Sequence, residues 1–174
     1  MKKNFMLGIV GFCLLFMLAT YAQSAVVYVK SDAAGANNGT SWANAFTNFQ
    51  TAINASAPGD QLWVCKGTYS GSFTSKDGIS IYGGFLGNET LLIERNWVLN
   101  ETILSSGGPI LTLSSNNTID GLIIKNGNYD YGGGINLPSG KSNVSTYNCQ
   151  FINNRSETQY NGRGGQYSPN RLSQ

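Results

Sequence analysis

The residues best suited to contact a ligand lie in a glycine-rich stretch near position 130. Asp130 is flanked by Tyr129 and Tyr131, and the three glycines 132–134 follow. Tyrosine rings on an exposed loop can stack on sugar faces, while a carboxylate can accept a hydrogen bond from a hydroxyl. The sequence therefore indicates a ligand-contact site at Tyr129, Asp130 and Tyr131, and the alternative is an ordinary loop tip.

The other charged residues have simpler structural explanations. Asp120 precedes a glycine at the start of a predicted strand, where turn geometry explains it better than calcium binding. Lys125 is expected on the outside of a strand. Glu94, Arg95 and Glu101 are expected to form surface ion pairs, which contribute little stability. No acidic cluster has the spacing of calcium ligands, so we predict no catalytic residue, no metal site and no cofactor.

Charge and composition exclude several classes of function. The chain has no histidine, which removes the commonest general base and the commonest zinc ligand. Its 11 lysines and arginines include Lys2 and Lys3 of the N-terminal segment, so 9 remain against 9 acidic residues. A neutral chain offers nucleic acid or an anionic membrane surface no electrostatic basis for binding.

The first residues have the layout of a secretory signal peptide. Lys2 and Lys3 precede an uncharged apolar run from Phe5 to Ala19, and small residues follow around Ala22. A retained membrane anchor is the alternative, but this run is too short to span roughly 30 Å of hydrocarbon comfortably. We expect a protein that is secreted or displayed at the cell surface, with no membrane span after cleavage.

Two cysteines, Cys65 and Cys149, remain after cleavage. An oxidising compartment permits a disulfide between them, yet each lies in an apolar, strand-like context. We favour free thiols that pack as small hydrophobic side chains.

One segment has the apolar spacing of a helix. Its apolar side chains fall on a single helical face, at Trp42, Ala45, Phe46, Phe49, Ala52 and Ile53. Thr40 or Ser41 would supply the N-cap, and a turn sequence at 57–60 ends the pattern. We predict an amphipathic helix from Ser41 to Ala55 that covers the open apolar end of the fold.

The segments after Asp60 have strand character, and they repeat. The segment around Leu111 aligns with the one around Ile135, and the segment around Ile124 aligns with the one around Phe151. Strands that recur every ~20–30 residues indicate a solenoid, whose stacked turns pair in parallel and align like residues. An antiparallel sandwich, the alternative, would predict two-residue hairpins and no such recurrence.

Several short motifs follow one another along the chain. They are Gly39–Phe46, Gly59–Val64, Lys66–Tyr69, Ile81–Phe85, Arg95–Trp97, Ile119–Gly121 and Tyr131–Ile135. In these motifs the chain resembles right-handed parallel β-helix proteins of the pectate-lyase-like superfamily. It is similar in particular to secreted Bacteroidetes-type proteins with polymorphic outer-membrane-protein repeats. The resemblance implies a fold but no activity, because the superfamily includes polysaccharide lyases, hydrolases and adhesins.

The chain departs from that family in length. Family members usually have many more turns, whereas about four turns give a face roughly 20 Å long, which is short for gripping an extended polysaccharide. The stretch from Arg155 to Gln174 loses the alternation of apolar residues. We expect either a truncated or frameshifted gene, or a fragment, with a plain polar tail as the alternative.

The predicted organisation has four parts. Residues 1–24 form the signal peptide, 25–56 an N-terminal strand and capping helix, 57–155 the parallel β-helix turns, and 156–174 an irregular polar tail. The expected fold class is all-β, a right-handed single-stranded parallel β-helix of about four turns with an N-terminal amphipathic capping helix. Asn126 is expected to stack on Asn153 at one of its bends.

The expected function is that of a secreted or cell-surface scaffold that serves adhesion or contacts polysaccharides or host glycans, without catalysis. The alternative is the N-terminal fragment of a polysaccharide lyase or glycoside hydrolase whose active turns are missing. The last turn is further expected to expose a parallel edge and apolar core, which would favour self-association.

Overall fold

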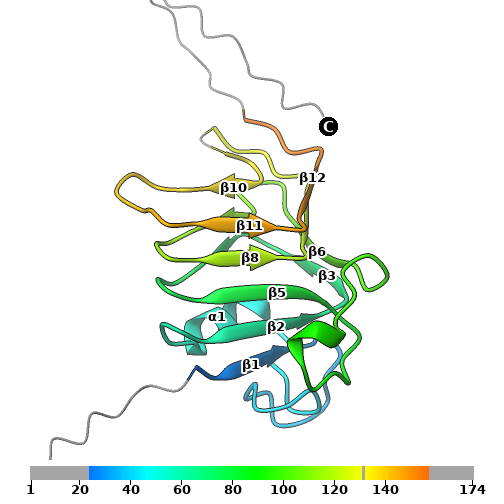
Figure 1. Cartoon of the computed structure of the whole chain (residues 1–174). Coiled ribbons are helices and arrows are strands. Elements are labelled where there is room, and N and C mark those ends of the chain that lie inside the picture. Colours follow the sequence, from blue (N-terminus) through cyan, green and yellow to red (C-terminus); the bar gives the residue numbers. More distant parts are fainter. Residues whose placement is uncertain (1–23, 131, 157–174) are drawn as a thin grey trace, which may run out of the picture.

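The computed structural model describes residues 24–130 and 132–156 of the chain (Figure 1). Apart from Ser24 and Ser156, the predicted signal peptide and polar tail lie outside the described residues, as does Tyr131. The elements in the described part are β1 (Val26–Val29), α1 (Phe49–Ala55), β2 (Gln61–Cys65), β3 (Gly67–Ser70), β4 (Phe73–Thr74), β5 (Ser80–Phe85), η1 (Leu92–Glu94), β6 (Thr102–Ser105), β7 (Leu111–Thr112), β8 (Thr118–Asp120), β9 (Ile123–Lys125), β10 (Ile135–Asn136), β11 (Ser145–Tyr147) and β12 (Gln150–Ile152).

The strands form three sheets, and from β2 onward the chain adds strands to these sheets in turn. Sheet 1 has the order β1-β2-β5-β8-β11, sheet 2 the order β3-β6-β9-β12, and sheet 3 the order β4-β7-β10. Figure 1 shows the strands of sheet 1 stacked in this order from β1 at the bottom to β11 near the top. All these strand pairs are parallel. The all-β class is confirmed for the described residues, and the antiparallel sandwich is wrong.

The pairing register agrees with the sequence repeats. Leu111 lies opposite Ile135, and Ile124 lies opposite Phe151, so both predicted alignments are confirmed. Because side chains alternate between the two faces of a strand, a slip by a single position would turn the apolar set outward. The match of apolar residues therefore determines the register.

In-register pairing builds columns of apolar side chains. In sheet 2, Tyr69 lies opposite Leu104, and Leu104 lies opposite Ile124. All three side chains are buried. Burying a leucine or isoleucine side chain stabilises the fold by about 1.5–3 kcal/mol relative to leaving it exposed.

The same column ends at an exposed phenylalanine. Phe151 takes the position next to Ile124 in β12, yet it is 51% exposed. Within the described part of the chain, no strand pairs with the far edge of β12. The exposure of core-type side chains at this end agrees with the sequence analysis, while self-association through it stays a prediction.

The helix is much shorter than expected. α1 begins at Phe49 rather than near Ser41, and its N-cap is Asn48, whose side chain accepts a hydrogen bond from Thr51 N. The preceding residues instead bond to β1: Tyr28 N donates to the Gly39 carbonyl. Further along, Phe46 N donates back to the Tyr28 carbonyl. These tertiary hydrogen bonds override the helical apolar spacing.

α1 occupies the end of sheet 3. Its side chains Phe49, Ala52 and Ile53 are buried in the core. Gln50 Nε2 donates to the Thr74 carbonyl at 3.0 Å, and Gln50 Oε1 accepts from Thr74 N at 2.8 Å. This amide satisfies a donor and an acceptor on the edge of β4, as a neighbouring strand would. An edge satisfied in this way is protected from pairing with another chain.

Asparagines in the left-handed region form several bends. Asn116 and Asn143 both have φ of 58°, and Asn143 Nδ2 donates to Asn116 Oδ1 at 3.0 Å. Asparagine tolerates this conformation better than most residues. Asn126 and Asn153 share the conformation, but Asn126 Nδ2 donates to Ser105 Oγ at 3.4 Å. The hydrogen bond expected between the side-chain amides of stacked asparagines therefore occurs between Asn143 and Asn116.

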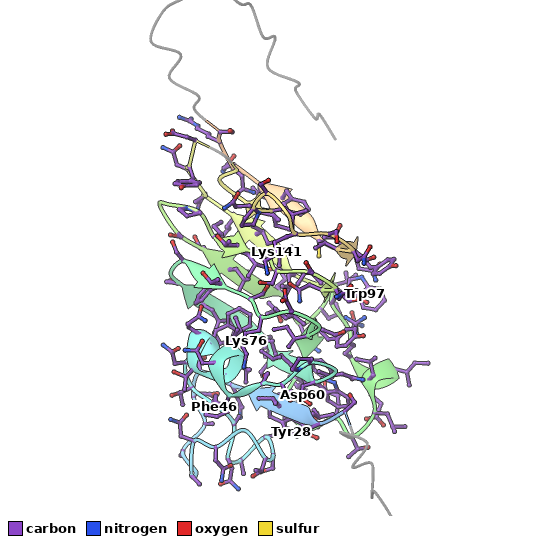
Figure 2. The ribbon with its side chains drawn as sticks, turned by 90° about the vertical axis from the view of Figure 1, so that its left-hand side faces the viewer. Tyr28, Phe46, Asp60, Lys76, Trp97 and Lys141 are labelled. Carbon is purple, nitrogen blue, oxygen red and sulfur yellow. The ribbon has the colours of Figure 1, made fainter. Side chains whose placement is uncertain are left out.

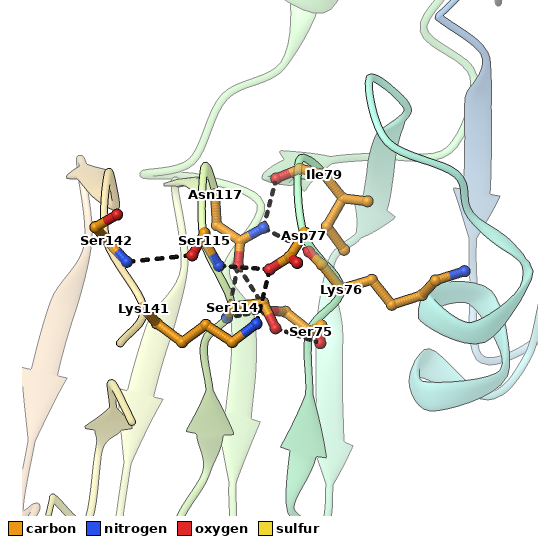
Figure 3. A network of polar contacts seen from close by, with 9 residues as sticks. All are labelled: Ser75, Lys76, Asp77, Ile79, Ser114, Ser115, Asn117, Lys141 and Ser142. Carbon is orange, nitrogen blue, oxygen red and sulfur yellow. Dashed lines mark hydrogen bonds and ion pairs between the residues drawn. The ribbon is translucent and has the colours of Figure 1, made fainter. Parts of the chain in front are cut away.

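A buried asparagine joins the segments that follow β4 and β7 (Figure 3). Asn117 Oδ1 accepts hydrogen bonds from Ser75 Oγ at 2.5 Å and Ser114 N at 3.0 Å. Asn117 Nδ2 donates to the carbonyls of Lys76 at 2.7 Å and Ile79 at 3.2 Å. Leaving a buried polar group without a partner costs about 1–3 kcal/mol, so this side chain holds the two segments in register.

Substitution of a residue in the apolar column of sheet 2 tests whether the strands are stacked in register. Ile124→Ala should lower the free energy of unfolding by about 2–5 kcal/mol, because it leaves a cavity between two apolar neighbours. Leu137→Ala, at an exposed position, is the control and should change it by no more than about 0.5 kcal/mol. Urea unfolding measures both, and equal losses would contradict the column.

Candidate functional site

Two of the three predicted ligand-contact residues, Tyr129 and Asp130, lie on an exposed loop between β9 and β10. Tyr129 is 39% exposed and Asp130 is exposed, while Tyr131 lies outside the described residues. Tyr129 N donates to the Arg155 carbonyl at 3.3 Å, and Ser156 Oγ donates to the Asp130 carbonyl at 2.8 Å. The loop therefore lies beside the segment that follows β12.

A hollow of about 570 Å³ is formed by residues next to this loop. It is lined by the two bends that follow β9 and β12, namely Asn126, Gly127, Asn128, Asn153, Asn154 and Arg155. The Asn154 side chain is engaged, since Oδ1 accepts from Gly127 N at 2.9 Å and Nδ2 donates to the Ile124 carbonyl at 2.8 Å. Asn126, Asn153 and Arg155 are exposed. Amide and guanidinium groups donate hydrogen bonds, and amides also accept them, which suits a ligand rich in hydroxyls.

The glycine run beside the hollow has a packing role. A Cβ at Gly133 would lie 2.3 Å from the Arg155 carbonyl oxygen and 2.4 Å from that of Gly127. Three backbone segments therefore approach so closely here that no side chain fits. The run allows the loop to lie against its neighbours.

The described residues that line the hollow are amides, one glycine and one arginine. None of these described residues carries a carboxylate, a thiol or an imidazole, so none of them exchanges a proton near neutral pH. Among the residues that the structure describes, no three of the Asp, Glu, Cys or His type gather to hold a metal ion. The described lining of the hollow therefore offers hydrogen-bonding groups and no acid–base pair.

Arg95 and Asp120 form a nearly buried ion pair, which corrects two expectations. The sequence alone predicts a surface pair of Arg95 with Glu94 or Glu101, but Arg95 Nη2 lies 2.5 Å from Asp120 Oδ2. The two side chains are 7% and 13% exposed. Asp120 does more than shape a turn, since Oδ1 also accepts a hydrogen bond from Asn148 Nδ2 at 2.8 Å.

Glycines let Arg95 and its neighbour Trp97 lie close against sheet 1. A Cβ at Gly84 would lie 2.7 Å from Trp97 Cα, and a Cβ at Gly121 would lie 2.8 Å from Arg95 Nη1. The Arg95 guanidinium lies over the Trp97 ring, with Cζ 4.9 Å from the ring centroid. Figure 2 shows Trp97 toward the right-hand side of the molecule. The structure thus brings together three motifs that are far apart in the sequence.

Residues 86–100 leave the sheets between β5 and β6, and we call them the flap. Side chains bind its backbone at several points. The Glu89 carboxylate accepts from Leu86 N and Gly87 N at 2.6 and 2.9 Å. Glu94 Oε2 accepts from Thr90 N at 2.7 Å. The flap is therefore held by its own polar side chains.

Hydrogen bonds decide the ionisation of Glu89. Burial alone would raise the pKa of its carboxyl, but the backbone N–H groups of 86–89 outweigh burial and lower the pKa. The Glu89 carbonyl also accepts from Trp42 Nε1 at 2.9 Å. The carboxylate thus fixes the start of the flap, which in turn fixes Trp42.

The flap carries apolar side chains that the sequence analysis did not identify as a feature. Those that are exposed are Leu86, Leu91, Ile93, Trp97, Val98 and Leu99. The signal in the sequence is a group of apolar residues that lacks strand alternation and is interrupted by Glu94, Arg95 and Asn96.

Both described cysteines are free thiols, as expected. Cys65 is buried and its Sγ donates to the Leu86 carbonyl at 3.2 Å. Burial raises the pKa of both Cys65 and Cys149. A raised pKa leaves little thiolate at neutral pH, so neither thiol is an activated nucleophile.

No protein-family model, no curated protein and no solved structure matches this chain. Within residues 24–130 and 132–156, no helix has both the length and the apolar character needed to cross a bilayer.

Removing one charge of the nearly buried pair should be costly. Asp120→Asn leaves the Arg95 guanidinium without a carboxylate, and we expect a loss of about 3–5 kcal/mol in unfolding free energy. Asp32→Asn, which breaks the more exposed pair with Lys30, should cost only about 0–1 kcal/mol. Urea unfolding of both variants is the measurement, and a loss for Asp120→Asn no larger than that of the control would contradict the role of this pair.

The lowered pKa of Glu89 predicts a pH-dependent contribution to stability. The contribution is complete above the ordinary pKa of a glutamate and is lost as pH falls through the lower pKa of the folded protein. Glu89→Gln should therefore destabilise the protein at pH 7, and the difference should shrink as pH falls below the ordinary glutamate range. Unfolding at a series of pH values tests this, and a difference that does not change with pH would refute it.

Proposed function

We propose that this chain is a right-handed parallel β-helix scaffold of the pectate-lyase-like superfamily, exported to the cell surface or medium, that contacts glycans without catalysis. The fold proposal is supported by the passage of the chain through three parallel sheets in turn. It is supported further by the in-register pairing of Leu111 with Ile135 and of Ile124 with Phe151. Such one-dimensional stacking is the principle of a solenoid.

Export is supported by the basic and then apolar N-terminal sequence. An extracellular location also relates the neutral charge of the mature chain to the ligands that it can meet. Extracellular glycans are abundant and often uncharged, so that recognition depends on hydroxyl groups and ring faces rather than on net charge. A protein with no excess charge after signal cleavage is suited to such ligands.

The observation that carries glycan contact is the hollow beside the Tyr129 loop. Its exposed asparagine amides and the Arg155 guanidinium offer hydrogen-bond donors and acceptors to hydroxyl groups. Tyr129, partly exposed at its border, offers a ring face for stacking on a sugar. Hydrogen bonds and ring stacking from one side suit a short stretch of polysaccharide that lies across the hollow.

The alternative function is that of a fragment of a polysaccharide lyase or hydrolase. The superfamily resemblance favours it, whereas the described residues that line the hollow offer no acid–base pair. Incubation of the purified protein with pectate and calcium distinguishes the two. Formation of unsaturated product would favour the lyase and contradict the non-catalytic proposal.

If the hollow contacts glycans, removal of the Tyr129 ring or the Asn153 amide should lower the affinity for polysaccharide. Affinity electrophoresis in gels that contain single polysaccharides should show retardation of the native protein by at least one of them. Tyr129→Ala and Asn153→Ala should each weaken that binding by roughly tenfold, the effect of about 1.4 kcal/mol. Lys141→Ala, which alters a bend outside the hollow, should leave it unchanged. No retardation by any polysaccharide, or equal losses in all three variants, would overturn the proposal.

A further inference from the structure

The flap presents an unusual concentration of exposed apolar side chains. Ile93 is 89% exposed, Leu99 78% and Val98 70%, and Leu86, Leu91 and Trp97 are exposed beside them. At these exposed fractions the six side chains present roughly 600 Å², the upper end of the roughly 300–600 Å² typical of the largest apolar patch on a monomer. A patch of this size usually marks an interaction surface.

The flap holds these side chains outward in a fixed conformation. Glu94 Oε2 accepts hydrogen bonds from Thr90 N and Leu91 N at 2.7 and 3.0 Å. Asn96 Oδ1 accepts from Val98 N and Leu99 N at 3.1 and 3.0 Å. Between the two, the ion pair with Asp120 fastens Arg95 to sheet 1. A surface held in its binding conformation loses little conformational entropy when a partner docks.

The charges of the flap are already satisfied within the molecule. The Glu94 and Glu89 carboxylates accept backbone N–H groups, which lower the pKa of both and keep them ionised. Arg95 is paired with Asp120. The apolar side chains therefore project from a segment, residues 86–100, that has no lysine and no unpaired arginine, so they offer a partner apolar contact rather than a positive charge.

The patch is suited to meet a copy of itself. A hollow of about 460 Å³ lined by Leu92, Ile93, Arg95 and Trp97 belongs to the same segment as the protruding Val98 and Leu99. In a two-fold dimer the same surface serves both partners, so a protrusion of each copy can enter the hollow of the other. The exposed area is most of the ~800 Å² per partner that a specific interface buries.

We propose that the flap is the interface of a two-fold dimer of this chain, in which Val98 and Leu99 of each copy pack into the hollow lined by Ile93 and Trp97 of the other. The interface lies on the outer side of sheet 1, apart from the hollow beside Tyr129. Dimerisation would present two glycan-contact loops on one particle, and bivalent contact raises avidity without any new contact to the ligand.

Sedimentation equilibrium of the mature chain from 1 to 100 µM tests the proposal. The native protein should form a dimer, and Leu99→Asp and Val98→Asp should each raise the dimer dissociation constant at least tenfold. Leu137→Asp, a charge placed at another exposed apolar position, is the matched control and should leave dimerisation unchanged. Circular dichroism and urea unfolding of each variant confirm that the monomer remains folded.

The open end of sheet 2 is the competing interface, and Phe151→Asp separates the two. This variant should still dimerise through the flap. A native protein that stays monomeric at 100 µM, or a dimer abolished by Phe151→Asp and unaffected by Leu99→Asp, would overturn the proposal. The monomeric Leu99→Asp variant should bind a soluble monovalent oligosaccharide as tightly as the native chain does. The test of dimerisation is therefore independent of the test of glycan contact.

Discussion

Parallel hydrogen bonding between strands that recur along the sequence is the constraint on which the other features depend. Ile124 can be buried only because Leu104 and Phe151 lie on its two sides, and the same pairing brings the bends of successive segments together. The hollow beside Tyr129 consists of two such bends, after β9 and β12. The surface under Arg95 and Trp97 likewise consists of glycines from β5 and from the position after β8. A change of register in sheet 2 would therefore disrupt the hollow, and one in sheet 1 would disrupt the surface under Arg95 and Trp97.

The outer strands at the two ends of the described structure differ in how far their edges are covered. At the first end, the segment 39–46 bonds to β1, and the Gln50 amide satisfies the edge of β4. At the other end, β10, β11 and β12 are the outermost described strands of their sheets, and Phe151 is exposed. The contrast shows how specific side chains protect an edge that would otherwise attract another strand.

Much of the fold could be predicted because its information is local and periodic. The strand character of the segments after Asp60 and the recurrence of the Leu111 and Ile124 segments are visible in the printed sequence, and each recurrence corresponds to a strand pairing. The start of the helix could not be predicted, since Trp42 and Phe46 have helical spacing but are held by hydrogen bonds to Glu89 and β1. These partners depend on the tertiary structure.

The functional surfaces were harder to predict for the same physical reason. The Arg95–Asp120 pair was missed because its residues are 25 positions apart, and only the stacking of β5 and β8 brings them together. The loop at Tyr129 was identified from residue types. The hollow beside it requires knowledge of which two bends are stacked.

The most direct test of parallel, in-register stacking is the detection of individual hydrogen bonds across it. In the structure Gln150 N donates to the Leu122 carbonyl at 2.9 Å, and Asn126 N donates to the Ile152 carbonyl at 3.0 Å. Solution NMR can detect such bonds as scalar couplings between the amide nitrogen and the carbonyl carbon. Parallel, in-register pairing predicts a coupling from Gln150 to Leu122 and one from Asn126 to Ile152. Couplings that connect β9 and β12 in antiparallel order, or with the register shifted by a single position, would contradict it.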